Sequence, residues 1–383
     1  MYKRMIGEFA DSGSSQIIGK KDFQNDIINL FKDFFDNINN LKTYSNDYLI
    51  QDYINYNKNN LHLYKNSLLE VRSFFTEAKR CCADKTFSGV ALFQPISVEM
   101  GNKHWSMLKL QNDLSKLEDY EYVYECFNLI EHICENLLKN LFVLMVYLNR
   151  IIVGKDADFN SIRHIRFGNL VNELKQSNKL NSVMNILVSN ISISQWRNIS
   201  CHKTYQYING KIQCQYGENL DKNETINTKE DLLHITKQLY TIAQVLLLPT
   251  KLFLYDNIES VRSKMDDLSL DIVGFRNEDW QLIYVTEMLA NGFIVTDITN
   301  ADKLEITVVD TKKDENYERI LLIPIAAYKA WVLTGKEQIK IIYVQRDGTP
   351  YVSIELTGDI CQKVSDYEKD FSYLAEKMII EKC

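Results

Sequence analysis

The chain has 383 residues, of which 45% are hydrophobic and 25% charged, and its formal net charge is -7. This composition excludes a disordered chain, and the length predicts two or three domains. The charge is unevenly distributed: residues 256–383 contain 15 Lys and Arg against 24 Asp and Glu, whereas residues 150–203 contain 8 against 3. We therefore expect an acidic final third and a basic middle stretch that attracts phosphate.

The sequence predicts neither a targeting signal nor a membrane-spanning segment. The basic start of the chain is followed by a polar stretch, residues 11–15, so we predict no export signal. The strongest apolar runs, 141–148 and 243–249, are much shorter than the roughly 20 residues that span a bilayer. The eight cysteines have irregular spacings, which favours reduced thiols. We predict a soluble, cytoplasmic protein that does not enter a membrane.

The first part of the chain, residues 20–80, is predicted to be helical. Apolar residues recur at helical spacing over residues 20–80, which predicts two or three helices separated by the Asn-rich segments 37–40 and 57–60. Gly89, Pro95 and Gly101 predict a loop over residues 86–104. We place a domain boundary near residue 110, which makes 1–110 an N-terminal helical region.

Four further helices are predicted between residues 111 and 256. The longest periodic run predicts a core helix over 114–153, and a polar break precedes two more helices. Asn209-Gly210 predicts a hairpin turn between two strands. The expected segments are helices 114–153, 162–177, 180–189 and 229–256, with a hairpin over 205–216. This order predicts a compact four-helix bundle over 111–256.

Alternating apolar residues replace the helical pattern after residue 270. The pattern predicts strands of a mostly antiparallel sheet at 292–296, 304–309, 320–323, 339–344 and 351–356. A helix near 326–333 and a terminal helix from about 365 to 380 complete a small acidic α+β domain over 268–383. The predicted fold class is thus mostly α, with a helical region, a four-helix bundle and a small domain with an antiparallel sheet.

The segment from Arg197 to His202 contains the residues best suited to catalysis. Cleavage of RNA without a metal needs a group that accepts the 2′-OH proton, a cation for the crowded phosphorane and a donor for the leaving oxygen. His202 suits proton transfer and Arg197 suits phosphate, while Asn198 lies four residues before His202 and shares its helix face. Residues five apart on a helix point about 140° away from each other, so Arg197 and His202 do not converge unaided.

Neighbouring residues extend this candidate site. Ser192 and Ser194 are of a residue type that caps helix N-termini, which predicts that the motif occupies the first turns of a helix, where anions are favoured. Clustered cations bind phosphates independently of base sequence. We therefore assign substrate contacts to Arg163, Arg166, Lys203 and Tyr205.

The motif R-N-x-x-x-H over residues 197–202, with Ile-Ser-Gln-Trp before it and a hairpin after it, resembles the signature of the HEPN superfamily of ribonucleases and toxins. The surrounding helices resemble the family's four-helix plan over residues 110–255. The resemblance implies a homodimer with two motifs facing across a cleft. It also implies metal-independent cleavage of single-stranded or tRNA-like RNA that leaves a 2′,3′-cyclic phosphate.

The family resemblance also assigns roles to residues. Arg197 and His202 become catalytic, Asn198 supports them, and an acidic residue of the first bundle helix, Glu131 or Glu135, assists the site. Many relatives are toxins or antiviral defence effectors, which predicts RNA as a partner and a regulatory protein as a possible second one. No cofactor or metal is expected.

Other interpretations of the same residues stay open. Arg197 also suits a structural ion pair and His202 an ordinary capping histidine, in which case the bundle is a catalytically silent module that binds a protein or RNA partner. A metal site at Cys126, His132 and Cys134 is disfavoured because one helix does not gather them on a single face. The sequence lacks nucleotide-binding and serine-hydrolase motifs.

Overall fold

The structure is a computed structural model that describes residues 20–45, 49–110, 114–270, 280–281, 284–285, 288, 292–311, 317–366, 368–369 and 372–382. The fold is mostly helical, as predicted, and contains two compact units. The larger unit contains Phe31–Tyr44 and Asn59–Phe275. The smaller unit contains the described residues of Met1–Leu30, Ser45–Lys58 and Arg276–Cys383. The basic start of the chain lies outside the described residues.

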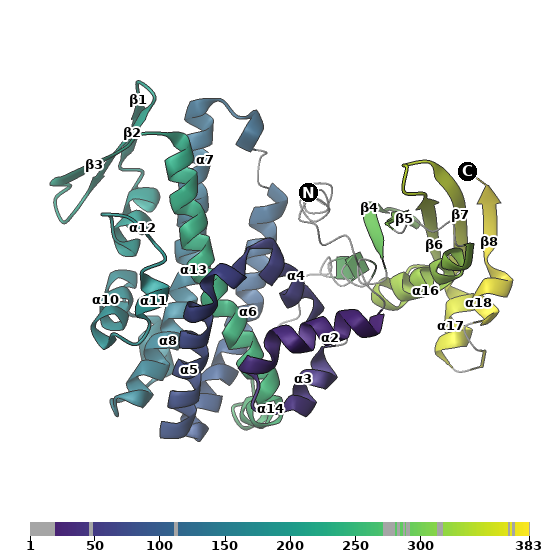
Figure 1. Ribbon diagram of the computed structural model, residues 1–383, viewed down its shortest axis with the longest axis horizontal. Helices are drawn as coiled ribbons and strands as arrows, with labels where there is room; N and C mark the ends of the chain where they lie inside the picture. The colour runs from purple at the N-terminus through teal and green to yellow at the C-terminus, as the bar shows by residue number, and fades with distance from the viewer. Residues whose placement is uncertain are drawn as a thin grey trace. The chain divides into compact units, whose positions relative to one another are not determined.

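Helices make up most of the larger unit (Figure 1). Its described helical segments are 3₁₀ turns at Lys32–Phe34, Leu61–Tyr64 and Leu114–Lys116, α3 Ile38–Tyr44, α5 Lys65–Cys81, α6 Ala83–Leu110, α7 Asp119–His132, a π-helix Ile133–Leu138, α8 Lys139–Ile152, α9 Phe159–Arg163, α10 Phe167–Ser177, α11 Asn181–Met184, α12 Ile193–His202, α13 Lys229–Asp256 and α14 Ile258–Asp267. In the core, α13 packs against α5 and α7, and α8 packs against α5, α6 and α10.

Helical periodicity correctly located α7, α8 and α13. The predicted helix over 114–153 corresponds to α7, the π-helix and α8 in unbroken succession, and α13 has the predicted bounds. Apolar side chains of α7 and α8 such as Phe127 and Leu144 are fully buried. The predicted helix over 180–189 is wrong beyond α11. Val188 is 77% exposed there, so it contributes nothing to the core that would hold a longer helix in place.

The loop predicted over residues 86–104 is wrong, because this segment belongs to α6. The sequence predicts a break at Gly89, but the lack of a side chain there lets α6 approach α8 closely. A Cβ atom at Gly89 would lie 2.6 Å from Cδ1 of Tyr147, whose hydroxyl donates to the Lys85 carbonyl at 3.0 Å. The division between the compact units therefore does not fall at residue 110, since α5 and α6 pack onto α8.

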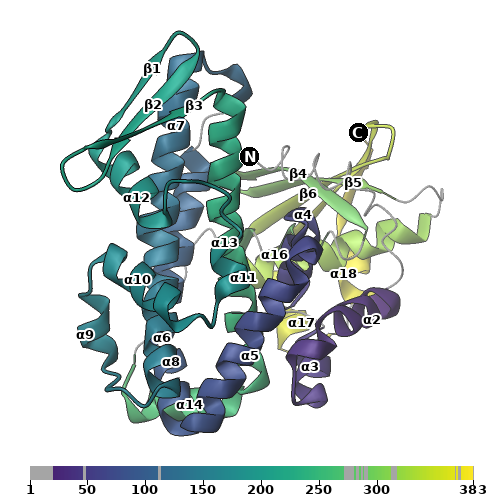
Figure 2. The ribbon, with the colours of Figure 1, turned by 60° about the vertical axis from the view of Figure 1, so that its left-hand side comes forward.

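A small three-stranded sheet follows α12. Strand β1 Tyr205–Ile208 pairs antiparallel with β2 Lys211–Tyr216, and β2 pairs with β3 Lys222–Ile226, which the sequence did not predict. The predicted hairpin is confirmed. Asn209 and Gly210 have φ values of 52° and 76°, and this left-handed pair closes the turn. Figures 1 and 2 show the three strands beside α7.

The smaller unit contains a five-stranded sheet in the order β4-β5-β6-β7-β8. Its elements are α2 Lys20–Phe31, α4 Ile50–Lys58, β4 Phe293–Asn300, β5 Leu304–Asp310, a 3₁₀ turn Tyr317–Leu322, α16 Ile323–Thr334, β6 Gln338–Val344, β7 Pro350–Thr357, α17 Gly358–Ser365, α18 Ser372–Lys377 and β8 Ile379–Lys382. α16 packs against β6 and β7, and α17 packs against β7.

The sheet is mostly antiparallel, as predicted, but β5 and β6 are parallel and α16 makes the crossover between them. Two other predictions for this sheet are wrong. The strand predicted over 320–323 is instead the end of the 3₁₀ turn and the start of α16, where Pro324 occupies the first turn and its fixed φ suits helix initiation. The predicted terminal helix over 365–380 divides into α18 and the edge strand β8.

A buried ion pair joins the strand ends of the smaller unit. Arg319 Nε donates to Asp310 Oδ2 at 2.7 Å, and the Tyr343 hydroxyl donates to the same oxygen at 2.9 Å. Arg319 Nη2 also donates to the Gly292 carbonyl, and its guanidinium lies 4.3 Å from the centre of the Phe293 ring. Because these charges are almost fully buried, the partners must satisfy one another, which fixes how β4, β5 and β6 end.

We expect Gly89→Ala to destabilise the larger unit by about 1–3 kcal/mol, because the added methyl group overlaps the Tyr147 ring. Urea unfolding of the full chain measures this change. Gly168→Ala is the matched control, since a Cβ atom there lies 3.8 Å from Ser194 Cβ and fits at ordinary contact distance. Equal stabilities of the Gly89 variant and the wild type would contradict the close packing of α6 on α8.

Candidate functional site

Both ends of α12 are defined by local hydrogen bonds. Ser192 is the N-cap and accepts from the Gln195 N–H, as the sequence predicted. Lys203 is left-handed, with φ 55°, and its N–H and that of Thr204 both donate to the Ile199 carbonyl. The helix therefore ends at His202. The expectation that the motif lies in the anion-favouring first turns is wrong, because His202 occupies the C-terminal end, where the helix dipole favours cations.

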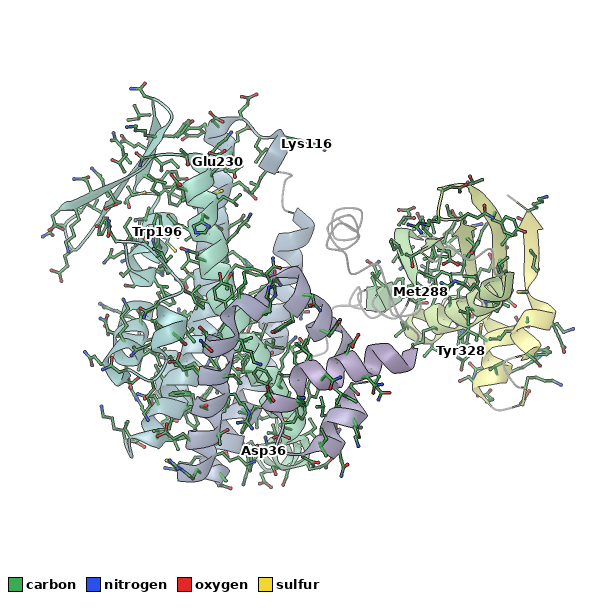
Figure 3. All side chains as sticks on the ribbon, in the orientation of Figure 1. Asp36, Lys116, Trp196, Glu230, Met288 and Tyr328 are labelled. Carbon is green, nitrogen blue, oxygen red and sulfur yellow. The ribbon has the colours of Figure 1, made fainter. Side chains whose placement is uncertain are left out.

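Trp196 anchors the inner side of α12 in the core. Its side chain, labelled in Figure 3, is 1% exposed. Its Nε1 donates to Ser189 Oγ at 3.1 Å, and its ring centre lies 6.4 Å from that of Phe127 on α7. Ile193 and Ile199 are buried on the same helix. This packing fixes the rotation of α12 and turns Arg197 toward the π-helix.

Glu135 of the π-helix holds the Arg197 guanidinium. Arg197 Nε donates to Glu135 Oε1, and Nη1 donates to Asn198 Oδ1 at 3.2 Å. The Arg197 and Glu135 side chains are 28% and 26% exposed. Burial lowers the pKa of Arg197, but the hydrogen bond to Glu135 and the nearby negative charges together raise it by more, so the net pKa is raised. Of the two candidate acids, Glu135 is the one that contacts Arg197.

Glu131, the other candidate acid, pairs with Lys203. Lys203 Nζ lies 2.9 Å from both Glu131 Oε2 and Asn128 Oδ1, and 5.5 Å from the centre of the Tyr124 ring. The two acids lie one turn apart and hold two cations of the α12 region. The backbone of Lys203 therefore ends α12, and its side chain attaches the turn to α7.

Strand β1 continues along α7 through aromatic contacts. The Tyr205 ring stacks on Phe127 with centres 3.7 Å apart, and the Tyr207 hydroxyl donates to Asp119 Oδ2 at 2.9 Å. Burial, followed by the nearby Tyr120, raises the pKa of Tyr205. We call the contacts of Arg197, Lys203, Tyr205 and Tyr207 with α7 and the π-helix the α7 seam.

The structure places the predicted catalytic residues on one helix without joining them. The His202 side chain is exposed, and among the described residues no hydrogen bond or ion pair connects it to another group. Asn198 accepts from Arg197 rather than contacting His202. The exposed imidazole is therefore accessible, while the guanidinium is held in place by Glu135.

The predicted substrate arginines lie away from His202. Arg163 ends α9 and Arg166 precedes α10, and both are exposed. Gly168, at the start of α10, lies close to Ser194 at the start of α12. Because His202 is eight residues farther along α12, about 12 Å separate the two ends of that helix. The structure therefore does not gather these arginines with His202.

The sequence did not predict a pair of stacked histidines beside the π-helix. His104 on α6 stacks with His132 at the end of α7, with ring centres 5.9 Å apart. The Tyr240 hydroxyl lies 3.3 Å from His104 Nε2, and Asn136 Nδ2 lies 3.0 Å from His132 Nδ1. No periodic signal could reveal this pair, because His104 fell in the segment predicted as a loop.

The pKa values of both histidines are depressed. Burial, followed by the neighbouring His132, lowers the pKa of His104 to about 4. Burial, followed by Lys103, lowers the pKa of His132. Both rings are therefore held neutral between α6, α7 and α13.

Other candidate chemistry receives no support from the geometry. No group of three or more His, Cys, Asp or Glu side chains suited to a metal occurs in the described part of the chain. Burial raises the pKa of the Cys201 thiol, which disfavours the thiolate form that a nucleophile needs. Within the same residues, no helix has both the length and the apolar composition to cross a membrane.

Comparisons of the chain with protein-family models, with curated proteins and with solved structures found no match.

The neutral histidine pair predicts a loss of stability in mild acid. Between pH 6.5 and about 4 the unfolded chain binds a proton at His104 that the folded chain does not, so the free energy of unfolding falls as the pH is lowered. The loss from His104 is on the order of 3 kcal/mol over this interval. Urea unfolding of the wild type and His104→Gln at several pH values measures it.

The exposed His62 supplies the control for this experiment. His62→Gln should keep the wild-type dependence on pH, whereas His104→Gln should flatten it. An unchanged slope in His104→Gln would contradict a neutral buried imidazole at this position.

Proposed function

We propose that the protein is a metal-independent endoribonuclease of the HEPN type that cuts single-stranded or tRNA-like RNA and leaves a 2′,3′-cyclic phosphate. The observation that carries the proposal is that Glu135 orients the Arg197 guanidinium while His202 is exposed at the end of the same helix. Preorganised cations stabilise charge that develops in a transition state, and an accessible imidazole transfers protons.

The proposed reaction uses these groups in one balanced step. His202 accepts the proton of the 2′-OH, the resulting oxygen attacks the adjacent phosphorus, and the bond from phosphorus to the 5′ oxygen breaks. The leaving oxygen gains a proton from a second imidazole, which the partner copy of the motif provides in a homodimer. Arg197 neutralises the equatorial phosphorane oxygens.

The proposal extends to a toxin or antiviral defence role in the cytoplasm. The acidic smaller unit is then the part that a regulatory protein would bind, since its residues 276–383 contain 13 Lys and Arg against 19 Asp and Glu. A catalytically silent module is the rival function, because an Arg–Glu pair also stabilises helix packing without any chemistry.

RNA cleavage in EDTA tests the proposal. We expect the wild type to cut single-stranded RNA and to leave cyclic phosphate ends, and we expect Arg197→Ala and His202→Ala each to slow cleavage by about 100-fold or more. Gel analysis before and after acid treatment, which opens the cyclic phosphate, measures both rate and product.

Two control variants separate chemistry from folding. His62→Ala removes another exposed histidine, and Arg150→Ala removes another Arg–Glu pair, in which Arg150 Nε lies 2.8 Å from Glu173 Oε1. Both should cleave at the wild-type rate. Cleavage that is equal in all variants, or that is absent from the wild type, would favour the silent module.

A further inference from the structure

A hollow of about 520 Å³, which we call the β3 hollow, lies beside β3 in the larger unit. Its walls come from β3 and the residue after it (224–227), the loop before α12 (188–190), Trp196 of α12, and Asp231 and Ile235 of α13. None of the residues assigned to the proposed reaction belongs to this lining. The β3 hollow is therefore a separate feature of the larger unit.

The β3 hollow runs along the free edge of a strand. β3 lies at one edge of the three-stranded sheet and pairs with β2 (Figure 1). Side chains alternate between the two faces of a strand, so a hollow lined by the consecutive residues 224–227 must reach the strand edge. In the part of the chain that the structure describes, these residues form no backbone–backbone hydrogen bond outside the β2–β3 ladder. The N–H and C=O groups of the outer edge are thus available to another strand.

Hydrogen bonds hold the loop wall of the β3 hollow in place. The Val188 N–H donates to Gln238 Oε1 at 3.2 Å, and Ser189 Oγ accepts from Trp196 Nε1 at 3.1 Å. The Val188 side chain is 77% exposed on this fixed loop, and Ile235 across the hollow is partly exposed. An apolar side chain of a bound partner would cover both, which removes apolar surface from water.

The charge of the lining selects the partner. Glu224 and Asp231 contribute carboxylates, and the lining contains no Lys, Arg or His. Asn190 Nδ2 donates to Glu224 Oε1 at 3.3 Å, but an amide is neutral and leaves the negative charge in place. Among the described residues, neither carboxylate forms an ion pair. Such a lining attracts ammonium and guanidinium groups and repels phosphates, which favours a basic peptide over a nucleic acid.

We propose that β3 binds an extended basic peptide segment of a partner protein, which adds to the sheet as a fourth strand along the β3 hollow. Backbone hydrogen bonds at the strand edge supply affinity, and the side chains of the peptide supply specificity. Its basic side chains meet Glu224 and Asp231, and an apolar side chain between them covers Val188. The inference does not depend on the proposed ribonuclease function.

Fluorescence anisotropy of the full chain with labelled synthetic peptides tests the proposal. The probe is a short peptide of alternating Lys and Val. One control peptide has Glu in place of every Lys, and a second carries a methyl group on every backbone nitrogen, so that it has no backbone donor for β3. We expect the Lys-Val peptide alone to bind, with an affinity that falls as the salt concentration rises.

Variants of the rim side chains locate the bound peptide. We expect Glu224→Gln and Asp231→Asn each to weaken binding of the Lys-Val peptide by about 2- to 5-fold, as for exposed charge pairs. Val188→Ser should weaken it by about 3-fold or more, because the apolar cover is lost. Glu218→Gln is the control, since it removes an exposed carboxylate between β2 and β3 that does not line the hollow, and it should bind like the wild type.

Binding that requires both the Lys side chains and the backbone N–H groups of the peptide, and that weakens in the rim variants, supports the proposal. Equal binding of either control peptide, no binding of the Lys-Val peptide, or wild-type affinity in Glu224→Gln and Asp231→Asn overturns it. A homodimer that the Lys-Val peptide dissociates, as measured by light scattering, also overturns it, because a second copy of this chain would then occupy the edge of β3.

Discussion

The ion pair between Arg197 and Glu135 is the contact on which the candidate site depends. It connects α12 to the π-helix, and the buried Trp196 behind it prevents α12 from rotating away. Farther along, Lys203 and Tyr205 attach the turn and β1 to α7. The α7 seam thus holds a short helix, which has only ten residues and little stability of its own, in a fixed position. The same packing places Glu135 against Arg197 and leaves the His202 imidazole exposed.

The π-helix contains the acidic residue that positions Arg197. π-helical turns are rare, and they occur often at functional sites because they displace side chains from the regular α-helical positions. Here the π-helix contains Glu135, which pairs with Arg197, and Asn136, which pairs with His132. The candidate site and the neutral histidine pair are therefore connected through one irregular turn.

Sequence patterns predicted the features that depend on local chemistry. Periodicity found α7, α8 and α13, and Asn209-Gly210 located the hairpin because both residues adopt positive φ. Features set by tertiary contacts were missed. Gly89 is a packing residue rather than a loop signal. Glu131 and Glu135 are four residues apart and share a helix face, so spacing could not choose between them. The N-cap Ser192 was identified, yet nothing local showed that α12 ends at His202.

The central claim is that Arg197 serves both the seam and the chemistry, and exchanging its charge with that of Glu135 tests it most directly. The double variant Arg197→Glu with Glu135→Arg retains opposite charges across the seam but moves the guanidinium to the π-helix. We expect a free energy of unfolding within about 1 kcal/mol of the wild-type value, as for partly exposed ion pairs, and complete loss of RNA cleavage. Cleavage at the wild-type rate by the exchanged protein would contradict it, because Arg197 would then be a structural residue alone.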